Sequence, residues 1–351
     1  MSDRKSNLPP EEGRESIPFL LARVSSAPIR IARARFAGPL PRVILEWQQP
    51  AARSRRVGAV ALVVAAMLFL VAIFADVLAS ETPLVCGAHG TVYVLPNVTH
   101  VPVEDVTWSI SAPLPFGPRT IVNPLERPSL RHLAGTDREG HDVLARTIHG
   151  TRTYLFFALG AVLAAVALGA IFGAIAGIFG EGVDAVVSRI IESVSAFPPL
   201  VLVLGVQAAV ARPSSLTLFL AIALTRWPII ARLVRGEVIA ATTRDYVLAA
   251  RALGASPLRI LVRHIVPNVR TPLVVAAAVN VGAVILTEAA LDFLRIGGTG
   301  AASWGETMSE LRDAPGAWWL FGLPGVLLVT TIIAFNLLGE ALRSVLDPRH
   351  Q

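Results

Sequence analysis

The stretch RDYVLAARALGASPLRILVRHIVPN, residues 244–268, decides how the rest of the chain is organised. It is too polar to cross a membrane, yet long apolar runs flank it on both sides. Its pattern predicts two short helices. Gly254 favours the left-handed backbone conformation that ends the first helix, and Ser256 followed by Pro257 is typical of the start of a second. We therefore expect a helical hairpin in a polar loop between two membrane-crossing segments.

The second helix of this hairpin carries its apolar residues at helical spacing. Leu258, Leu261, Val262 and Ile265 are predicted to form its buried face. Pro267 lacks a backbone N–H, so we expect the second helix to end there.

The chain as a whole is too apolar for a soluble domain. Its 351 residues have a mean hydropathy of +0.61, and 54% of them are hydrophobic. These values fit a helical protein that crosses a membrane several times. The net charge is +6, and residues 1–56, with eleven basic and five acidic side chains, carry the same +6. The excess charge in this tail predicts contact with an anionic lipid bilayer and not with nucleic acid.

The counts of two residue types limit the chemistry. A single cysteine, Cys86, allows no disulfide within the chain. Only one of the 31 basic residues is a lysine, Lys5, and no glycine-rich stretch precedes it. A P-loop needs a lysine after its glycines to reach the phosphates of a nucleotide. We therefore expect no ATP binding by a P-loop, and no cofactor, on this chain.

Six apolar segments predict six membrane spans, at residues 57–78, 154–179, 194–210, 216–231, 271–294 and 318–338. Three arginines precede the first span, which places the N-terminus in the cytoplasm, and six spans return the C-terminus to that side. The central loop 232–270 falls inside as well, and its seven arginines against two acidic residues agree with that placement.

This topology divides the chain into four parts. A basic cytoplasmic tail at 1–56 precedes the first span at 57–78, and an external, periplasmic lobe follows at 79–152. Residues 153–349 form a core with five spans and the central loop. We predict an all-α membrane protein of six transmembrane helices, with a lobe of strands or irregular structure between helices 1 and 2.

Three short sequence signatures, the first of them in two parts, resemble one family. YVLAARALGAS and RHIVPN, in the central loop, resemble the coupling loop of ABC importer permeases of the dipeptide, oligopeptide and nickel transport family, although Leu248 stands where many permeases have Glu. GTDREGHDVLAR, at 135–146, resembles the signature GTDxxGRDVLxR, with His141 in place of Arg. Ser303-Trp304-Gly305 is similar to an outer-loop word of the same family, and residues 79–132 resemble the external insert of microcin-C-type permeases.

The resemblance implies a C-type permease with the type I ABC importer bundle, in the bacterial cytoplasmic (inner) membrane. Such a subunit translocates peptides and makes or breaks no bond itself. Its partners would be a second homologous permease, two ATP-binding cassette ATPase subunits, and a periplasmic or lipid-anchored solute-binding protein. The 244–268 loop would couple ATP hydrolysis on the partner chains to transport.

The resemblance also assigns residues to roles. The coupling loop would include Tyr246, Ala249, Ala250, Arg251, Gly254, Ala255, Ser256, Pro257, Arg263 and Pro267. The outer-mouth signature is Gly135, Thr136, Asp137, Gly140, Asp142 and Arg146. Independently of the family, polar groups inside a span are functional candidates because burying them is costly. The candidates for the translocation path on this ground are Asn280, Glu288 and Asp292.

Several alternatives remain open at this point. Nickel or another small solute is the runner-up cargo, and an ion-coupled secondary carrier or a structural scaffold are the alternatives from other classes. Glu288 and Asp292 could instead form a polar contact with the partner permease. We expect Arg226 to extend toward lipid headgroups near the end of its span, and Trp304 to lie at the membrane interface or on the docking surface for the binding protein. We expect no metal site, since Asp137 and His141 lack the spacing of a zinc helix.

Overall fold

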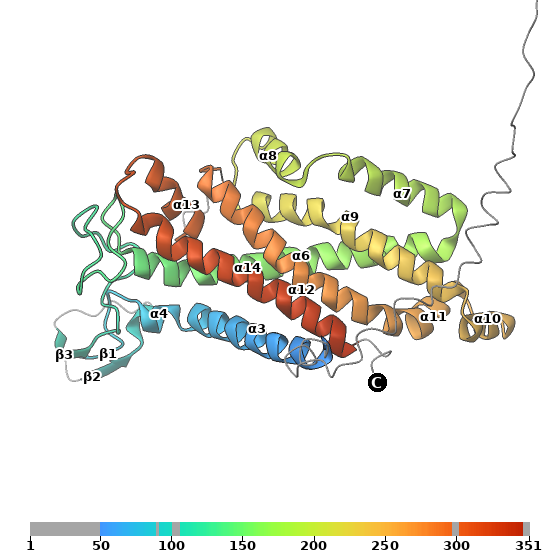
Figure 1. The fold of residues 1–351 in the computed structure, drawn as a ribbon, viewed down its shortest axis with the longest axis horizontal. Coiled ribbons are helices and arrows are strands. Elements are labelled where there is room, and N and C mark those ends of the chain that lie inside the picture. The colour runs from blue at the N-terminus through green and yellow to red at the C-terminus, as the bar shows by residue number, and fades with distance from the viewer. Residues whose placement is uncertain (1–49, 89–90, 100–105, 297–301, 347–351) are drawn as a thin grey trace, which may run out of the picture. The chain divides into compact units, whose positions relative to one another are not determined.

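The computed structural model describes residues 50–88, 91–99, 106–296 and 302–346 (Figure 1). The chain divides into two units, residues 1–50 and residues 51–351, and nearly all of the described architecture belongs to the second. The predicted basic tail at 1–56 lies almost entirely outside the described residues.

Five helices are long and apolar enough to cross a membrane: α3 (Pro50–Ile73), α6 (Val143–Phe179), α9 (Ser215–Thr242), α12 (Val266–Phe293) and α14 (Trp319–Leu346). A sixth span is possible if α7 (Glu181–Ser195) and α8 (Pro199–Ala209) count together, but the pair is bent by 84°. Pro198 and Pro199 lie at the bend, where proline and its restriction of the preceding residue interrupt a helix. Between the second and third predicted spans the sequence predicts a short loop at 180–189, but in the structure α7 begins at Glu181 and includes residues 181–189.

Helices α6 and α9 pack closely because three glycines of α6 face α9. A Cβ added to Gly169 would lie 2.5 Å from the Cβ of Ile230, and one added to Gly177 would lie 2.7 Å from that of Val238. Gly173, between them, faces Val234. Small residues that let two backbones approach are the main packing device of membrane helices. The glycines of the predicted span at 154–179 thus set how closely α6 and α9 approach each other.

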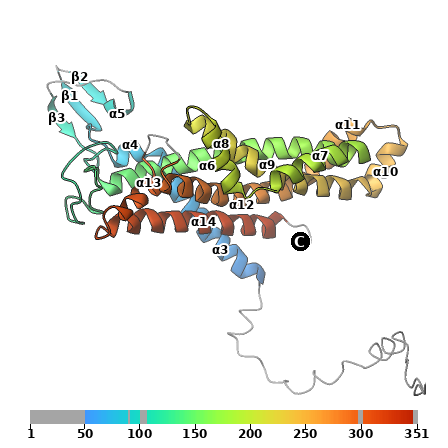
Figure 2. The same ribbon diagram turned by 90° about the horizontal axis from the view of Figure 1, so that it is seen from above.

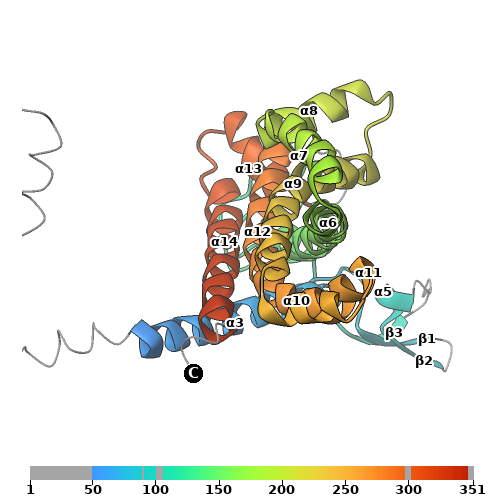
Figure 3. The same ribbon diagram turned by 90° about the vertical axis from the view of Figure 1, so that its right-hand side faces the viewer.

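Helix α12 is central to the bundle, since it contacts α14, α6 and α9 (Figure 3). The largest cluster of buried apolar side chains joins these helices around Leu155, Leu218 and Ile285. Helix α3 crosses α14, where the rings of Phe69 and Phe335 meet edge to face at 6.4 Å. Most of the exposed apolar side chains of α3, such as Val60 and Met67, face away from the bundle and fit a lipid environment.

The lobe between α3 and α6 contains the short helix α4 (Ala75–Leu78) and a three-stranded antiparallel sheet. Strand β1 (Val85–Ala88) lies between β2 (Thr91–Val94) and β3 (Val106–Ile110), and the one-turn helix α5 (Pro96–Thr99) follows β2. The expectation of strands or irregular structure in this lobe is confirmed. Within the second unit, this sheet and α10 (Asp245–Ala252) lie at opposite ends of the helices (Figure 2).

Candidate functional site

The predicted coupling loop is a helical hairpin at one end of the bundle, which we call the central hairpin (residues 244–268). It comprises α10, α11 (Pro257–Ile260) and one π-helical stretch, η1 (Leu261–Ile265). Gly254 has φ +81°, and no atom lies within 4 Å of the position that a Cβ would take there. Ser256 accepts the backbone N–H of Arg259, and Pro257 is the first helical residue. The predicted turn and start of the second helix are confirmed.

Two details of the hairpin prediction are wrong. Pro267 does not end a helix, because it lies in the first turn of α12, where a missing N–H breaks no bond, and η1 leads directly into that turn. The predicted apolar face is also only half correct. Leu261 and Ile265 are buried, but Leu258 and Val262 are exposed and Ile260 is buried in their place. The π-helical stretch causes this, because it changes the spacing on which the prediction relied.

The base of the hairpin is fixed to the ends of α9 and α12. Val247 and Ile260 are fully buried against a cluster that includes Val238 and Ala241 of α9. Asn268 at the start of α12 donates hydrogen bonds to the hydroxyl of Tyr246 (3.3 Å) and to the carbonyl of His264 (2.7 Å). The two words of the sequence that matched the family are thus bonded to each other. The base of the hairpin is therefore anchored to both helices.

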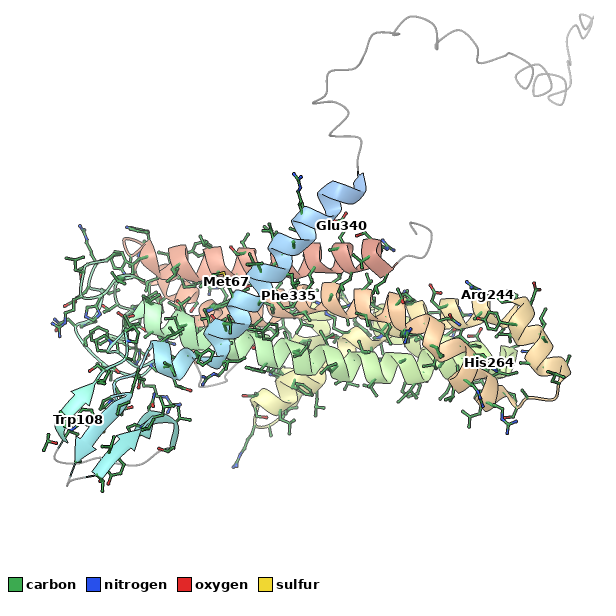
Figure 4. The ribbon with its side chains drawn as sticks, turned by 90° about the horizontal axis from the view of Figure 1, so that it is seen from below. Met67, Trp108, Arg244, His264, Phe335 and Glu340 are labelled. Atoms are coloured by element: carbon green, nitrogen blue, oxygen red, sulfur yellow. The ribbon has the colours of Figure 1, made fainter. Side chains whose placement is uncertain are left out.

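The opposite side of the hairpin is open. Four large apolar side chains are 48–88% exposed, and we call them the exposed apolar set: Leu248, Leu253, Leu258 and Val262. Arg251, Arg259 and Arg263 are exposed among them. Ala249 is exposed too, whereas Ala250 and Ala255 are half-buried against the hairpin's own base. Figure 4 shows Arg244 and His264 at this end of the helices, remote from Trp108 on the sheet.

A cavity of about 810 Å³ lies beside the hairpin, between α9, α12 and the end of α14. We call it the basic cavity, because Arg244, Arg270 and Arg343 line it and Glu237 is the one acidic residue in its lining. Asn280, predicted for the translocation path, also lines this cavity, with its amide bonded to the carbonyl of Ala276 (2.9 Å). Tyr246 and Pro267 of the hairpin form part of its wall.

The signature at residues 135–146, which we call the GTD segment, lies at the other end of α6 and is closed by internal bonds. The carboxylate of Asp137 is fully buried and accepts from the backbone N–H of His141 (2.7 Å) and from Arg146 Nη1 (2.8 Å). Asp142 is the N-cap of α6, accepting from Ala145 N, and its other oxygen lies 2.9 Å from Nδ1 of His132.

The GTD segment also reaches the elements that precede α14. Arg146 donates to Glu306 (2.9 Å) in α13 (Trp304–Ser309), and Arg138 pairs with Asp313 (2.6 Å). The indole N–H of Trp319, at the start of α14, donates to the carbonyl of Thr136 (3.0 Å). In η2 (Glu310–Arg312), burial raises the pKa of Glu310, although its carboxylate accepts the backbone N–H of Arg138. These contacts join the GTD segment, near the start of the core sequence, to the elements from α13 to the start of α14, near its end.

The acidic residues predicted for the translocation path lie inside this chain. Asp292 is 5% exposed and accepts from the hydroxyls of Tyr154 (2.7 Å) and Ser303 (2.5 Å). Glu288 is fully buried one turn earlier, and neither of its oxygens has a hydrogen-bond partner among the described residues. Asp292 therefore forms a polar contact between segments of this chain, whereas Glu288 forms none among the described residues. A role along the path stays a prediction for both.

The position of Trp304 differs from the prediction. It is fully buried, stacks on Tyr154 with ring centroids 4.8 Å apart, and donates to the carbonyl of Thr147 (2.9 Å). It is neither at the membrane interface nor on a docking surface. Gly150, which precedes the expected second span, faces the indole, and a Cβ there would lie 2.8 Å from it.

Comparison with known proteins identifies the family. Residues 169–351, more than half of the chain, match the family described as "Binding-protein-dependent transport system inner membrane component". The chain belongs to this family. Among its relatives, a peptide transport system permease of Brucella suis is 39% identical over 224 residues, which are 63% of this chain and 75% of the relative. The dipeptide transport system permease protein of Alkalihalophilus pseudofirmus is 36% identical over 229 residues, or 65% and 75% of the two chains.

Membership of the inner membrane component family confirms the predicted fold class, an all-α, multi-pass importer permease bundle of the inner membrane. The di/tripeptide transport system permease protein of Pseudomonas aeruginosa, at 35% identity over 227 residues, covers 64% of this chain and 75% of its own. The family match begins at residue 169, after the GTD segment, and includes the central hairpin and the basic cavity.

The position of Arg226 also differs from the prediction. Helix α9 continues to Thr242, so Arg226 lies near its middle and not near its end. Its guanidinium donates to Thr287 Oγ1 (2.7 Å) and to the carbonyl of Ala283 (3.1 Å), both on α12. The side chain therefore joins two helices and does not extend toward headgroups.

Sequence reasoning missed three features of the site. Tyr154 was treated as an ordinary span residue, although its hydroxyl organises Asp292, Ser303 and the N–H of Gly305. The exposure of the exposed apolar set could not be predicted from the sequence. Helical periodicity identifies an apolar face, but it does not show whether that face packs within the chain or stays exposed. The three arginines of the basic cavity are far apart in sequence, and a charge count of the central loop was the one available signal.

Proposed function

We propose that this chain is the permease subunit of an ATP-binding cassette importer that carries peptides across the cytoplasmic membrane. The relatives at 35–39% identity are named for transport of peptides, dipeptides or di- and tripeptides, which supports peptide cargo over nickel. The family membership supports an importer over a secondary carrier. The one observation that carries the proposal is the central hairpin, which is rigidly based on α9 and α12 yet presents an unpartnered apolar surface.

The central hairpin is the proposed contact for the ATPase subunits. Leu253 is 88% exposed, and an apolar side chain of that size at a hairpin tip favours burial against another protein. The surrounding arginines give the contact a polar, basic rim, as protein interfaces commonly have. The assembly would contain a second homologous permease, two ATPases and an external solute-binding protein. This chain would need no cofactor and would hydrolyse no ATP itself.

The proposed orientation places the central hairpin and both termini in the cytoplasm. Seven arginines in residues 232–270 support this side for the hairpin, because basic loops stay on the cytoplasmic side. The end of α14, with Arg343, lies at the basic cavity on that same side. The GTD segment and the sheet would then face the periplasm.

Transport would proceed by alternating access. Closure of the ATPase pair would move the central hairpin, and the buried contacts of Val247 and Ile260 would pass that motion to α9 and α12. Because Tyr246 and Pro267 line the basic cavity, the same motion would change its shape. The cavity would form this subunit's part of the cytoplasmic end of the path, with the second permease closing its open side.

The experiment compares two exposed leucines at opposite ends of the molecule. Leu253→Asp should leave membrane insertion intact but reduce co-purification of the ATPases and peptide uptake into proteoliposomes at least ten-fold, because one charge buried in a protein contact costs several kcal/mol. Leu130→Asp, at a side chain that is 99% exposed near the GTD segment, is the matched control and should retain the ATPases. Normal ATPase association in the Leu253→Asp variant would remove the main support for the proposal.

The orientation has its own test. A topology reporter inserted after Pro128 should read as external, and one inserted after Gly254 as cytoplasmic. Both reporters on one side of the membrane would contradict the proposed arrangement. The purified chain alone should show no ATP hydrolysis.

A further inference from the structure

The basic cavity combines charged groups at its mouth with apolar walls deeper in the bundle. It follows α9 from Ile229 to Ala241 and α12 from Pro267 to Asn280. At 1.5 Å per helical residue this is a length of about 20 Å. The deep part is lined by apolar side chains of both helices, with the amide of Asn280 as its polar group. A volume of about 810 Å³ is typical of sites that hold a small organic ligand.

The charge of this cavity is not balanced. Arg244 comes from the start of α10, Arg270 from the first turns of α12, and Arg343 from the end of α14. None of the three forms an ion pair within the described residues, and neither does Glu237. By contrast, Arg235, on α9, pairs with Asp184. Three positive charges therefore face one negative charge around a single hollow.

Such an arrangement acts on a charged solute in two ways. Low-dielectric walls concentrate the field of the charges at the mouth, which raises the local concentration of anions and lowers that of cations. The planar guanidinium also matches a carboxylate geometrically and can bind it through two parallel hydrogen bonds. A peptide carries a terminal carboxylate and, when acidic, further ones on its side chains. The chemistry of the cavity therefore suits the anionic groups of a peptide.

Resting on the proposed transport of peptides, we propose that Arg244, Arg270 and Arg343 form a carboxylate-binding subsite that selects among cargo peptides on their way to the cytoplasm. Peptides with acidic side chains are favoured there over peptides with basic ones. The selection lies in the permease and is separate from the choice made by a solute-binding protein. Movement of the central hairpin displaces Arg244 together with Tyr246, so the subsite is disassembled when the cargo is released.

The first arm of the test measures the field in the cavity. Val279, which is 39% exposed and lines the cavity, is replaced by cysteine in a Cys86→Ser background, so that one thiol is present. Its reaction rates with an anionic sulfonatoethyl and a cationic trimethylammonioethyl methanethiosulfonate are compared. Replacing Arg244, Arg270 and Arg343 together by Gln should lower the ratio of anionic to cationic rates about five-fold, as expected for the loss of three solvent-screened charges that line the same cavity.

A matched triple variant controls for net charge. Arg119, Arg127 and Arg131 are exposed on the segment that precedes the GTD segment, and replacing these three by Gln removes the same charge far from the cavity. The rate ratio at Val279→Cys should stay unchanged in this control. An equal fall of the ratio in both triple variants would overturn the proposal, because the effect would then come from total charge.

The second arm measures selection during transport by the complete importer in proteoliposomes. Two peptides of equal length, with Asp or Lys at one central position, are chosen so that the binding protein binds them equally. The cavity triple variant should lower the Asp-to-Lys uptake ratio about three-fold, as expected for loss of a screened carboxylate contact. An unchanged uptake ratio would overturn the subsite while leaving the importer function intact. Failure of the native complex to take up either peptide would instead overturn the proposed function, and the subsite with it.

Discussion

The GTD segment and the central hairpin are both short, charged segments at the ends of long helices, and they are built in opposite ways. In the GTD segment the charges are satisfied within the chain: Asp137 is fully buried and holds Arg146, which in turn holds Glu306. In the central hairpin the base is buried, but the arginines and leucines of the outer side are exposed, with Leu253 at 88%.

The glycines of the two regions show the same contrast. Gly135 and Gly254 have similar left-handed backbones, with φ +72° and +81°. A Cβ at Gly135 would lie 2.7 Å from the carbonyl of Glu126 and 2.8 Å from the ring of Trp319, whereas a Cβ at Gly254 would meet nothing within 4 Å. A short charged segment can therefore either be bonded and packed within the chain or be left exposed at its surface.

The largest effect is expected from Arg146→Leu in the GTD segment. It leaves the fully buried carboxylate of Asp137 without its ionic partner, which costs about 3–5 kcal/mol. We expect little folded protein in the membrane, measured by monodisperse recovery in detergent and by thermal unfolding. Glu306→Gln is the control, because that side chain is 50% exposed and its loss should cost about 1 kcal/mol or less. Equal recovery of both variants would contradict the description of this segment as closed.

A matched pair of glycine substitutions sharpens the contrast. Gly254→Ala should lower stability by only about 1 kcal/mol, the cost of a left-handed backbone for a residue with a Cβ. Gly135→Ala carries the same backbone cost and in addition displaces Glu126 and Trp319, so its loss should be larger by about 1–3 kcal/mol. Thermal unfolding of the two variants in the same detergent measures the difference. Equal losses would mean that the crowding around Gly135 relaxes.

Two adjacent alanines separate stability from coupling in the central hairpin. Ala249→Glu changes an exposed position, so it should alter unfolding by about 0.5 kcal/mol or less while impairing ATPase association. Ala250→Glu places a charge against the buried base, and should lower both stability and association. Parallel measurements of melting temperature and ATPase co-purification give the comparison. Full association in the Ala249→Glu variant would place the contact elsewhere on the hairpin.

The smallest expected effect is on the pH dependence of stability at the GTD end of the molecule. Burial raises the pKa of Glu310 above its ordinary value of 4.5, so the folded state holds this proton more tightly than the unfolded state does. The contribution to stability is full below about pH 4.5 and is lost as pH rises through the folded-state pKa. Glu310→Gln should remove this part of the pH dependence, which would show as a flatter plot of melting temperature against pH above about 4.5. A parallel plot for the variant would exclude the contribution of Glu310.

The sequence predicted five of the six spans, the lobe and the hairpin turn because hydropathy and glycine chemistry are local properties. The third predicted span, at 194–210, is interrupted at Pro198 and Pro199. It placed the end of the fourth span at residue 231, although α9 continues to Thr242, because Arg232, Arg235 and Glu237 lower the hydropathy of a helix that extends past the bilayer. The contact of Arg235 with Asp184 on α7 explains how that polar end is held, and no local pattern could reveal it.

The buried position of Trp304 was beyond prediction for a related reason. Its word resembled an outer-loop signature, and tryptophan is common at membrane interfaces, but the stacking on Tyr154 depends on two segments about 150 residues apart in sequence. The basic cavity likewise requires three helices to meet. The sequence shows the three arginines, but it could not predict that they line one cavity.

The π-helical stretch at Leu261–Ile265 has a mechanical consequence. Because Pro267 falls in the first turn that follows it, helical structure runs without a gap through the 37 residues from Pro257 in the hairpin to Phe293. At 1.5 Å per residue this is a rod of about 55 Å. If a helix of this length tilts as one body by about 10° at one end, its other end moves by about 10 Å. Glu288 and Asp292 lie at that far end, so such a tilt would act on the hydrogen bonds that Asp292 accepts from Tyr154 and Ser303.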